Sequence, residues 1–367
     1  MSIFTILNQR SLQRTYCAIN FALIFCVYFF IGIIPILFAQ ENLSANSKPT
    51  SAELLRSVIN KTAIWLVRID TIGGFEKVGD EFANEGTSTG ILLDKEGYVL
   101  TSSFNFLHAP TSILLRFSNG TKKIARCVAV DYNRMLTLLK VEDFDASFLP
   151  SESLKFRDKN DIKIAEPVVV VAVALSPDEP NITRGIISGK NRIWKKAIQT
   201  DAAISPNNYG GVLIGLDGNL LAIAVPLSMT SNEITAGSDT YDAGVGLAIP
   251  FEDINKNVLN KLKEGKNLES GYIGTTFKEN QIFVGEPILN NVEPESPAAK
   301  AGLKKGDKII KIDGNKIETA LEYEMNTKPR YAGEKIEITY TRDGKENNIT
   351  IETTIPPKKK NNTKGNQ

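Results

Sequence analysis

Short apolar runs separated by turns dominate the sequence between residue 63 and about residue 250. Runs such as Gly90–Leu93, Tyr98–Thr101 and Val168–Val173 are rich in β-branched and aliphatic residues, and glycine, asparagine and aspartate separate them. Many short strands at this spacing are typical of an all-β barrel or sandwich rather than an α/β sheet. Helical patterns precede and follow these runs, from Ser51 and over Phe251–Lys263. The sequence therefore predicts a mainly β domain over residues 51–263.

Composition changes mark the remaining boundaries. Residues 40–50 are polar and rich in turn formers, which predicts a linker, and residues 264–270 form a short charged hinge. A second unit, predicted to be a small α+β domain, covers residues 271–355. The tail over residues 356–367 has too little apolar content to order itself.

The N-terminus indicates export. Arg10 and Arg14 precede an uncharged run from Tyr16 to Ala39, and a basic segment followed by an apolar one is typical of a secretory signal. The run is also long enough to span a bilayer, which needs about 20 apolar residues. Residues 1–39 are therefore predicted to be either a cleaved signal peptide or a retained membrane anchor, and the rest of the chain is expected to be periplasmic or otherwise extracytoplasmic.

Composition argues against several classes of partner. The chain of 367 residues has a formal net charge of +1, whereas nucleic-acid-binding domains carry a basic patch. With three cysteines and one histidine, the sequence predicts no disulfide framework and no zinc site. Cys127 is interpreted as a small core residue. We expect no metal and no cofactor, membrane contact only through the N-terminal segment, and a protein or peptide as partner.

A tight turn is predicted at Gly210-Gly211, within the segment from Ser205 to Leu213. Two consecutive glycines after Tyr209 indicate backbone angles or close approaches that other residues do not tolerate. By itself this pattern also fits a hairpin turn in any β domain.

Four separated segments resemble the HtrA family of exported trypsin-like proteases, in which a protease barrel precedes one or two PDZ domains. These segments are Gly86–Thr101, Asp131–Val141, Ile198–Leu213 and Gly244–Pro250. The resemblance covers nearly all of residues 50–355. It implies a trypsin-like double β-barrel followed by one PDZ domain, and it suggests a homotrimer or association with active relatives.

The catalytic residues do not follow this resemblance. Carrying the family's triad over position by position puts its histidine at Phe104, its aspartate at Met135 and its serine at Tyr209. Ser-His-Asp catalysis needs a nucleophile, a base and an orienting carboxylate, and these side chains supply none of them in a usable form. In the oxyanion loop, formed by Asn207, Asn208 and Gly210, an asparagine also replaces the usual first glycine.

The sequence therefore predicts a pseudoprotease, in which the three substituted side chains fill the former cleft. The alternative is an active serine-type endopeptidase with a non-standard site. His108, Asp131 and Ser205 each lie four residues from a lost position. Such a displacement moves a side chain by far more than the roughly 1 Å that catalytic geometry tolerates.

The second unit resembles a PDZ domain through the segment Val292–Gly314 and the later hairpin Tyr340–Lys345. In PDZ domains a glycine-containing loop binds a peptide's C-terminal carboxylate, and the peptide adds as a strand to the sheet. By resemblance the loop is Tyr272, Ile273, Gly274 and Thr275, the adjoining strand begins at Thr276 and Phe277, and the groove helix is Ala320–Lys328 with Leu321 and Met325. The expected ligands are protein or peptide C-termini and unfolded polypeptides, in envelope protein quality control or regulation.

Overall fold

The computed structural model describes residues 50–73, 77–78, 81–82, 86–106, 109–227, 244–278 and 284–357. The predicted signal or anchor, most of the linker, His108 and the tail after residue 357 lie outside these ranges. Both barrels and the second domain belong to one compact unit, which begins at Arg56. Within the described part, no helix is both long and apolar enough to cross a membrane.

Helix α2 (Ser51–Ala63) opens the described chain. Its start is capped by Thr50, which receives a hydrogen bond from the backbone of Glu53 at 3.3 Å and donates its own N–H to the Glu53 carboxylate at 2.8 Å. This reciprocal pair satisfies backbone donors that the first helical turn leaves without partners.

Six strands close the first barrel in the order β1-β4-β5-β8-β7-β6. All its ladders are antiparallel. The 3₁₀ turn η1 (Ser103–Phe106) follows β5, and a short hairpin of β2 (Lys77–Val78) and β3 (Glu81–Phe82) lies between β1 and β4. The barrel strands are β1 (Leu66–Ile72), β4 (Gly86–Leu92), β5 (Tyr98–Ser102), β6 (Ser112–Phe117), β7 (Lys122–Asp131) and β8 (Leu136–Val141).

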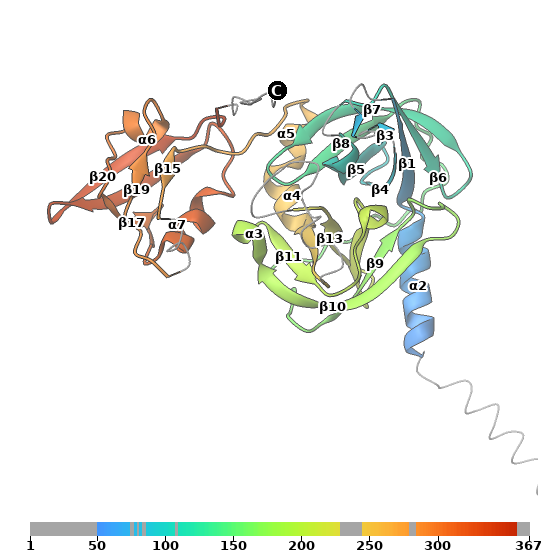
Figure 1. Cartoon of the computed structure of the whole chain (residues 1–367). Coiled ribbons are helices and arrows are strands. Elements are labelled where there is room, and N and C mark those ends of the chain that lie inside the picture. Colours follow the sequence, from blue (N-terminus) through green and yellow to red (C-terminus); the bar gives the residue numbers. More distant parts are fainter. Residues whose placement is uncertain are drawn as a thin grey trace, which may run out of the picture. The chain divides into compact units, whose positions relative to one another are not determined.

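Six further strands close the second barrel in the order β10-β11-β14-β13-β12-β9. Figure 1 shows its long strand β10 curving around the others. Its strands are β9 (Pro167–Ala172), β10 (Asn181–Asn191), β11 (Ala197–Thr200), β12 (Val212–Gly215), β13 (Leu220–Ala224) and β14 (Gly246–Pro250), with the turns α3 (Arg192–Lys195) and η2 (Pro206–Asn208) between them.

The burial of strand β9 explains why the sequence has a continuous apolar run at Val168–Val173. Val168 and Val170 point into the core of the second barrel, where they pack with Ile198 and Leu213. Val169 and Val171 on the opposite face are equally buried. Both faces of the strand are therefore covered, so no polar residue alternates with the valines. The predicted double β-barrel is confirmed.

The segment after β14 is helical, as expected, but it forms two helices rather than one. Helix α4 (Phe251–Asn257) ends before Val258, and α5 (Leu259–Lys263) follows. Val258 departs from ideal helical geometry, with φ −116° and ψ −51°. Phe251, Ile254, Val258 and Leu262 are all fully buried, so the apolar face continues across the break.

Cys127 is exposed, so its interpretation as a core residue is wrong. The pairing register of β7 and β8 shifts between Cys127 and Ala129. Such a bulge puts two residues of one strand opposite one of its partner and turns a side chain away from its expected face. Ala125 and Ala129 on either side point into the core instead.

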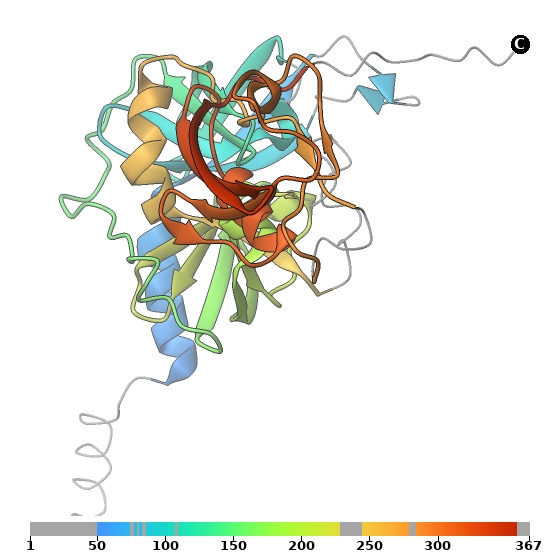
Figure 2. The ribbon, with the colours of Figure 1, turned by 90° about the vertical axis from the view of Figure 1, so that its left-hand side faces the viewer.

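The second domain is a small α+β unit built on a four-stranded sheet in the order β18-β17-β19-β20. Figure 2 shows the strong twist of its longest pair, the red strands β19 and β20. Its core contains Ile309, Ile338 and Tyr323, among others. The elements are β15 (Thr275–Thr276), β16 (Asn291–Val292), α6 (Pro297–Lys300), β17 (Lys308–Ile312), β18 (Asn315–Lys316), α7 (Ala320–Thr327), β19 (Lys335–Arg342) and β20 (Lys345–Glu352).

Candidate functional site

The fold brings together Phe104, Met135 and Tyr209, which are far apart in the sequence. Phe104 lies in η1, directly after β5, and Met135 lies in the turn between β7 and β8. The Ser103 N–H donates to the Met135 carbonyl at 2.8 Å, which ties these two turns together. The Phe104 ring meets the Tyr209 ring edge to face, with centroids 5.2 Å apart and planes at 60°.

Met135 and Tyr209 are buried, and Phe104 is partly buried. Met135 is 1% exposed and Tyr209 is 6% exposed. Met135 also has φ = 58°, a left-handed conformation that favours glycine, asparagine and aspartate. The backbone conformation at position 135 therefore suits glycine, asparagine or aspartate better than methionine. Burial of the Met135 thioether offsets the free-energy cost of this conformation.

The backbone donors of the loop around Tyr209 are engaged within the turn. The N–H of Asn208 donates to the Ser205 carbonyl at 2.8 Å, and the N–H of Tyr209 donates to the Pro206 carbonyl at 3.2 Å. An oxyanion hole requires backbone N–H groups directed at the position where the substrate oxygen develops charge. In this conformation, these two donors have acceptors within their own loop.

The two glycines after Tyr209 are required by close contacts. Gly210 has φ = 79°, and a Cβ there would lie 1.9 Å from the carbonyl oxygen of Thr89 on β4. A Cβ on Gly211 would lie 2.8 Å from the Val171 carbonyl oxygen on β9. Thr89 also donates its N–H to the Tyr209 carbonyl at 3.2 Å. The predicted tight turn therefore contacts β4 of the first barrel and β9 of the second, and neither contact leaves room for a side chain.

Asp131 and Ser205, the neighbours weighed as substitutes for the lost residues, have other partners. The Ser205 hydroxyl donates to Asn208 Oδ1 at 2.9 Å. Asp131 is fully buried and accepts hydrogen bonds from Tyr331 Oη at 2.6 Å and from the N–H groups of Asn133 and Arg134. Asp131 therefore binds Tyr331 of the second domain and stabilises the turn that contains Asn133 and Arg134.

The predicted peptide-binding loop lies at the start of the second domain. Gly274 has φ = 87°, and a Cβ there would lie 2.2 Å from Ser296 Cβ. The N–H groups of Ile273 and Gly274 donate to no acceptor within the described ranges, whereas their carbonyls accept from the N–H groups of Ala298 and Glu293. Two adjacent donors without a partner are suited to binding a carboxylate.

Tyr323, which the sequence analysis did not single out, reaches from α7 to the strand beside this loop. Its hydroxyl is hydrogen-bonded to Thr275 Oγ1 at 2.7 Å, and its ring packs on Phe277 with centroids 4.9 Å apart. Burial raises the pKa of Tyr323 well above its usual value. The expected groove residues Leu321 and Met325 are only partly buried, and Met325 lines a cavity with residues of the barrel domain.

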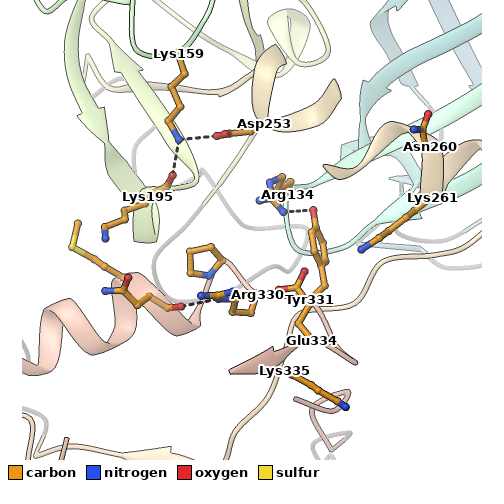
Figure 3. Close-up of a pocket in the computed structure, with 13 residues that line it drawn as sticks. Arg134, Lys159, Lys195, Asp253, Asn260, Lys261, Arg330, Tyr331, Glu334 and Lys335 are labelled. Atoms are coloured by element: carbon orange, nitrogen blue, oxygen red, sulfur yellow. Dashed lines mark hydrogen bonds and ion pairs between the residues drawn. The ribbon is translucent and has the colours of Figure 1, made fainter. Parts of the chain in front are cut away.

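Sequence reasoning also missed a polar cluster that joins the second domain to the turn between β7 and β8. Arg134 donates to Tyr331 Oη, and Asn133 Nδ2 donates to the carbonyls of Pro329 and Arg330 at 3.1 and 3.2 Å. Lys196 Nζ donates to the Asn133 carbonyl at 3.0 Å. Figure 3 shows Arg134 and Tyr331 meeting beside Lys261. No motif signals these contacts because they join residues between 63 and 197 positions apart.

Burial and neighbouring charges shift the pKa values of Lys196 and Asp131 in this cluster. Burial and the charge of Arg134 lower the pKa of Lys196 to about 8. Burial also raises the pKa of Asp131, although Arg134 and the Tyr331 hydroxyl oppose this shift. The two effects have the same cause, since desolvation penalises the charged form of each group.

Two closed barrels and a separate twisted sheet define the fold class as a trypsin-like peptidase domain followed by a PDZ domain. The family described as "Trypsin-like peptidase domain" matches residues 88–223, and "PDZ domain" matches residues 271–353. In its domain order the chain is similar to HtrA-type proteases, as the relatives below indicate.

Curated relatives carry HtrA-type names. The chain is 27% identical over 277 residues to a probable periplasmic serine endoprotease, DegP-like, of Halomonas elongata, covering 72% of this chain and 55% of that protein. It is 29% identical to the serine protease Do-like HtrA of Lactococcus lactis, covering 74% of this chain and 71% of that protein. The chain thus spans only part of the length of these relatives.

Solved structures agree on the fold. The HtrA-type protease AlgW with a tripeptide matches with a TM-score of 0.63 at 24% identity, covering 84% of this chain and 98% of that one. A serine endoprotease from Yersinia pestis matches with a TM-score of 0.60 at 24% identity, covering 84% and 99%. At this identity the likeness concerns the fold.

Proposed function

We propose that this protein is a catalytically inactive HtrA-type homologue that binds peptide C-termini or unfolded polypeptides through its PDZ domain. The packing of Phe104 on Tyr209 beside buried Met135 carries the first half of the proposal. A phenyl ring cannot accept the proton of a nucleophile, and a thioether cannot orient an imidazole. The internal hydrogen bonds of the Asn208 and Tyr209 N–H groups support the same conclusion.

The alternative is an active serine-type endopeptidase, which the names of the relatives favour. Such an enzyme would require a nucleophile and a base elsewhere in the cleft. Ser205 is the nearest hydroxyl in sequence, but its hydrogen bond to Asn208 leaves it without a basic partner in the described structure. The residues therefore favour the inactive form over the activity that the relatives' names imply.

A fluorophosphonate probe is expected to leave the purified protein unlabelled, and casein is expected to remain intact in its presence. Both results follow because a tyrosine phenol occupies the position of the serine nucleophile. Mass spectrometry of the intact protein measures the labelling, and a catalytically active HtrA-type protease is the positive control. Stoichiometric modification of any serine would overturn the inactive assignment.

The proposal places the peptide carboxylate at the N–H groups of Ile273 and Gly274. Thr275 and Thr276 would pair with the peptide backbone, and Tyr323 borders the same groove. These interactions use main-chain groups, so they do not depend on the catalytic positions. Relatives named as periplasmic support an extracytoplasmic setting in which protein termini become exposed. Homotrimers or complexes with active relatives are part of this proposal.

Gly274→Ala is expected to weaken binding of peptides with a free C-terminus by at least tenfold, because a methyl group there collides with Ser296. Gly344→Ala is the matched control. Gly344 also has a positive φ, of 75°, but open space surrounds its Cβ position. Fluorescence anisotropy with free and C-terminally amidated peptides measures both variants. Equal binding of the two peptide forms would contradict the carboxylate-binding role.

A further inference from the structure

A cavity of about 710 Å³ lies within the unit formed by residues 56–367, where α5 and the β7–β8 turn meet the end of α7 and the start of β19. Figure 3 shows that its labelled side chains come from both domains. Its volume falls in the range of small-molecule sites, roughly 300–1,000 Å³. The cavity is separate from Tyr209 and from the loop at Gly274, since neither residue lines it.

The lining is strongly basic. Six of its side chains are basic and two are acidic, whereas the whole chain has a net charge of only +1. Lys159 is paired with Asp253 at 2.8 Å. Lys195, Lys261 and Lys335 form no salt bridge with any residue that the structure describes. A cavity with this excess of positive charge attracts anions.

Arg134 supplies a second, independent observation. It lines the cavity, is only 8% exposed, and its Nε is buried without a hydrogen-bond partner in the described structure. Its Nη1 donates to Tyr331 Oη, and its guanidinium lies 4.8 Å from the centre of the Tyr331 ring. A buried guanidinium donor without an acceptor is costly, and an anionic ligand would reduce that cost.

The electrostatic environment of Lys196 also favours an anion in the cavity. Lys196 is 5% exposed, and burial, followed by the charge of Arg134, lowers its pKa to about 8 although Asp131 opposes the shift. Lys328 on the second domain lowers the pKa further. Basic groups of both domains therefore repel one another around this cavity, and bound negative charge would offset the repulsion.

We propose that this cavity binds a compact ligand carrying several phosphate groups. Several separate cations are arranged for more than one anionic group, and flexible lysines with an arginine suit phosphate oxygens. The few apolar lining residues, such as Met325 and Pro329, offer little to the side chains of a peptide. Such a ligand would contact Arg134 and Lys261 of the barrel domain and Lys335 of the PDZ domain at once, and would hold the two domains together. The phosphates could belong to a soluble polyphosphate or to a lipid headgroup.

Isothermal titration calorimetry of the full chain with sodium tripolyphosphate at low ionic strength tests the proposal. Saturable binding is expected, together with a rise in melting temperature of several degrees. Citrate, a tricarboxylate, is the comparison for multiple charge without phosphate. Vesicles of phosphatidylcholine with and without cardiolipin distinguish a lipid headgroup from a soluble ligand.

The double variant Lys261→Glu and Lys335→Glu is expected to lose at least tenfold in affinity for tripolyphosphate. Both side chains are exposed, so the fold should tolerate the change. The matched control is Lys311→Glu with Lys345→Glu, which makes the same charge change at exposed positions outside the cavity. Binding confined to cardiolipin vesicles and lost in the first variant alone would assign the headgroup. Undetectable binding of both probes, equal binding of citrate, or equal losses in the two variants would overturn the proposal.

Discussion

Replacing Met135 with aspartate is expected to lower the free energy of unfolding by roughly 3–5 kcal/mol, the cost of a buried charge without a partner. Met135 is 1% exposed, and its neighbouring turn presents Phe104, which cannot donate a hydrogen bond to a carboxylate. One effect opposes the loss. Aspartate tolerates the left-handed conformation at this position better than methionine does, by about 1 kcal/mol. The net change remains destabilising because desolvation of the carboxylate is the larger contribution.

Urea denaturation measures this difference, with Met135→Leu as the control that preserves volume and apolar character. The leucine variant is expected to lose less than about 1.5 kcal/mol. Burial raises the pKa of the introduced carboxyl, so its penalty should be complete at neutral pH and should shrink as the pH falls and the group binds a proton. A loss below about 1 kcal/mol at pH 7 would mean that position 135 remains a solvated site, and would count against the packed cleft.

Asp131→Ala is expected to destabilise the protein by about 3–5 kcal/mol, because it breaks a buried charged network by removing one partner. The substitution removes the acceptor of the Tyr331 hydroxyl and of two backbone N–H groups. It also leaves Arg134 and Lys196 buried without this negative charge. The network joins the barrel to the PDZ domain, so cleavage within residues 264–270 by an added protease should also become faster.

Tyr331→Phe is the matched control for this second prediction. It removes only one hydroxyl and retains the ring that packs near Arg134. A smaller loss, of about 1.5–3 kcal/mol, is expected, because the hydroxyl bonds both Asp131 and Arg134 but Asp131 keeps its two backbone donors. Thermal and urea unfolding, combined with limited proteolysis, separate the two variants. Indistinguishable effects of the two substitutions would show that Asp131 contributes no more than its bond to Tyr331.

Much of the fold could be predicted because the responsible interactions are local or leave a repeated pattern. Valine-rich runs such as Val168–Val173 specify strands, and the resemblance of four segments to HtrA proteins assigned their order in space. The Gly210-Gly211 pair predicted a tight turn, and the contacts with Thr89 and Val171 explain why a side chain cannot fit. The break at Val258 was not predictable, because the apolar periodicity continues through it.

The positions of individual side chains depended on tertiary contacts. Cys127 lies in a strand that reads as regular, but the bulge before Ala129 turns it outward. Tyr323 is one of several apolar or aromatic residues on α7, and only the folded domain shows that it reaches Thr275. The basic cavity was also invisible, since its lysines and arginines are scattered over about 200 residues of a chain that is nearly neutral overall.

The sequence by itself determined the two-domain β architecture and the identities of Phe104, Met135 and Tyr209, because strand patterns, glycine turns and residue types are properties of the chain. Only the tertiary structure decided that Phe104 packs on Tyr209, that Met135 is buried and that Asp131 binds Tyr331. Burial, hydrogen-bond partners and local charge arise when distant segments meet, so they cannot be deduced from any one segment alone.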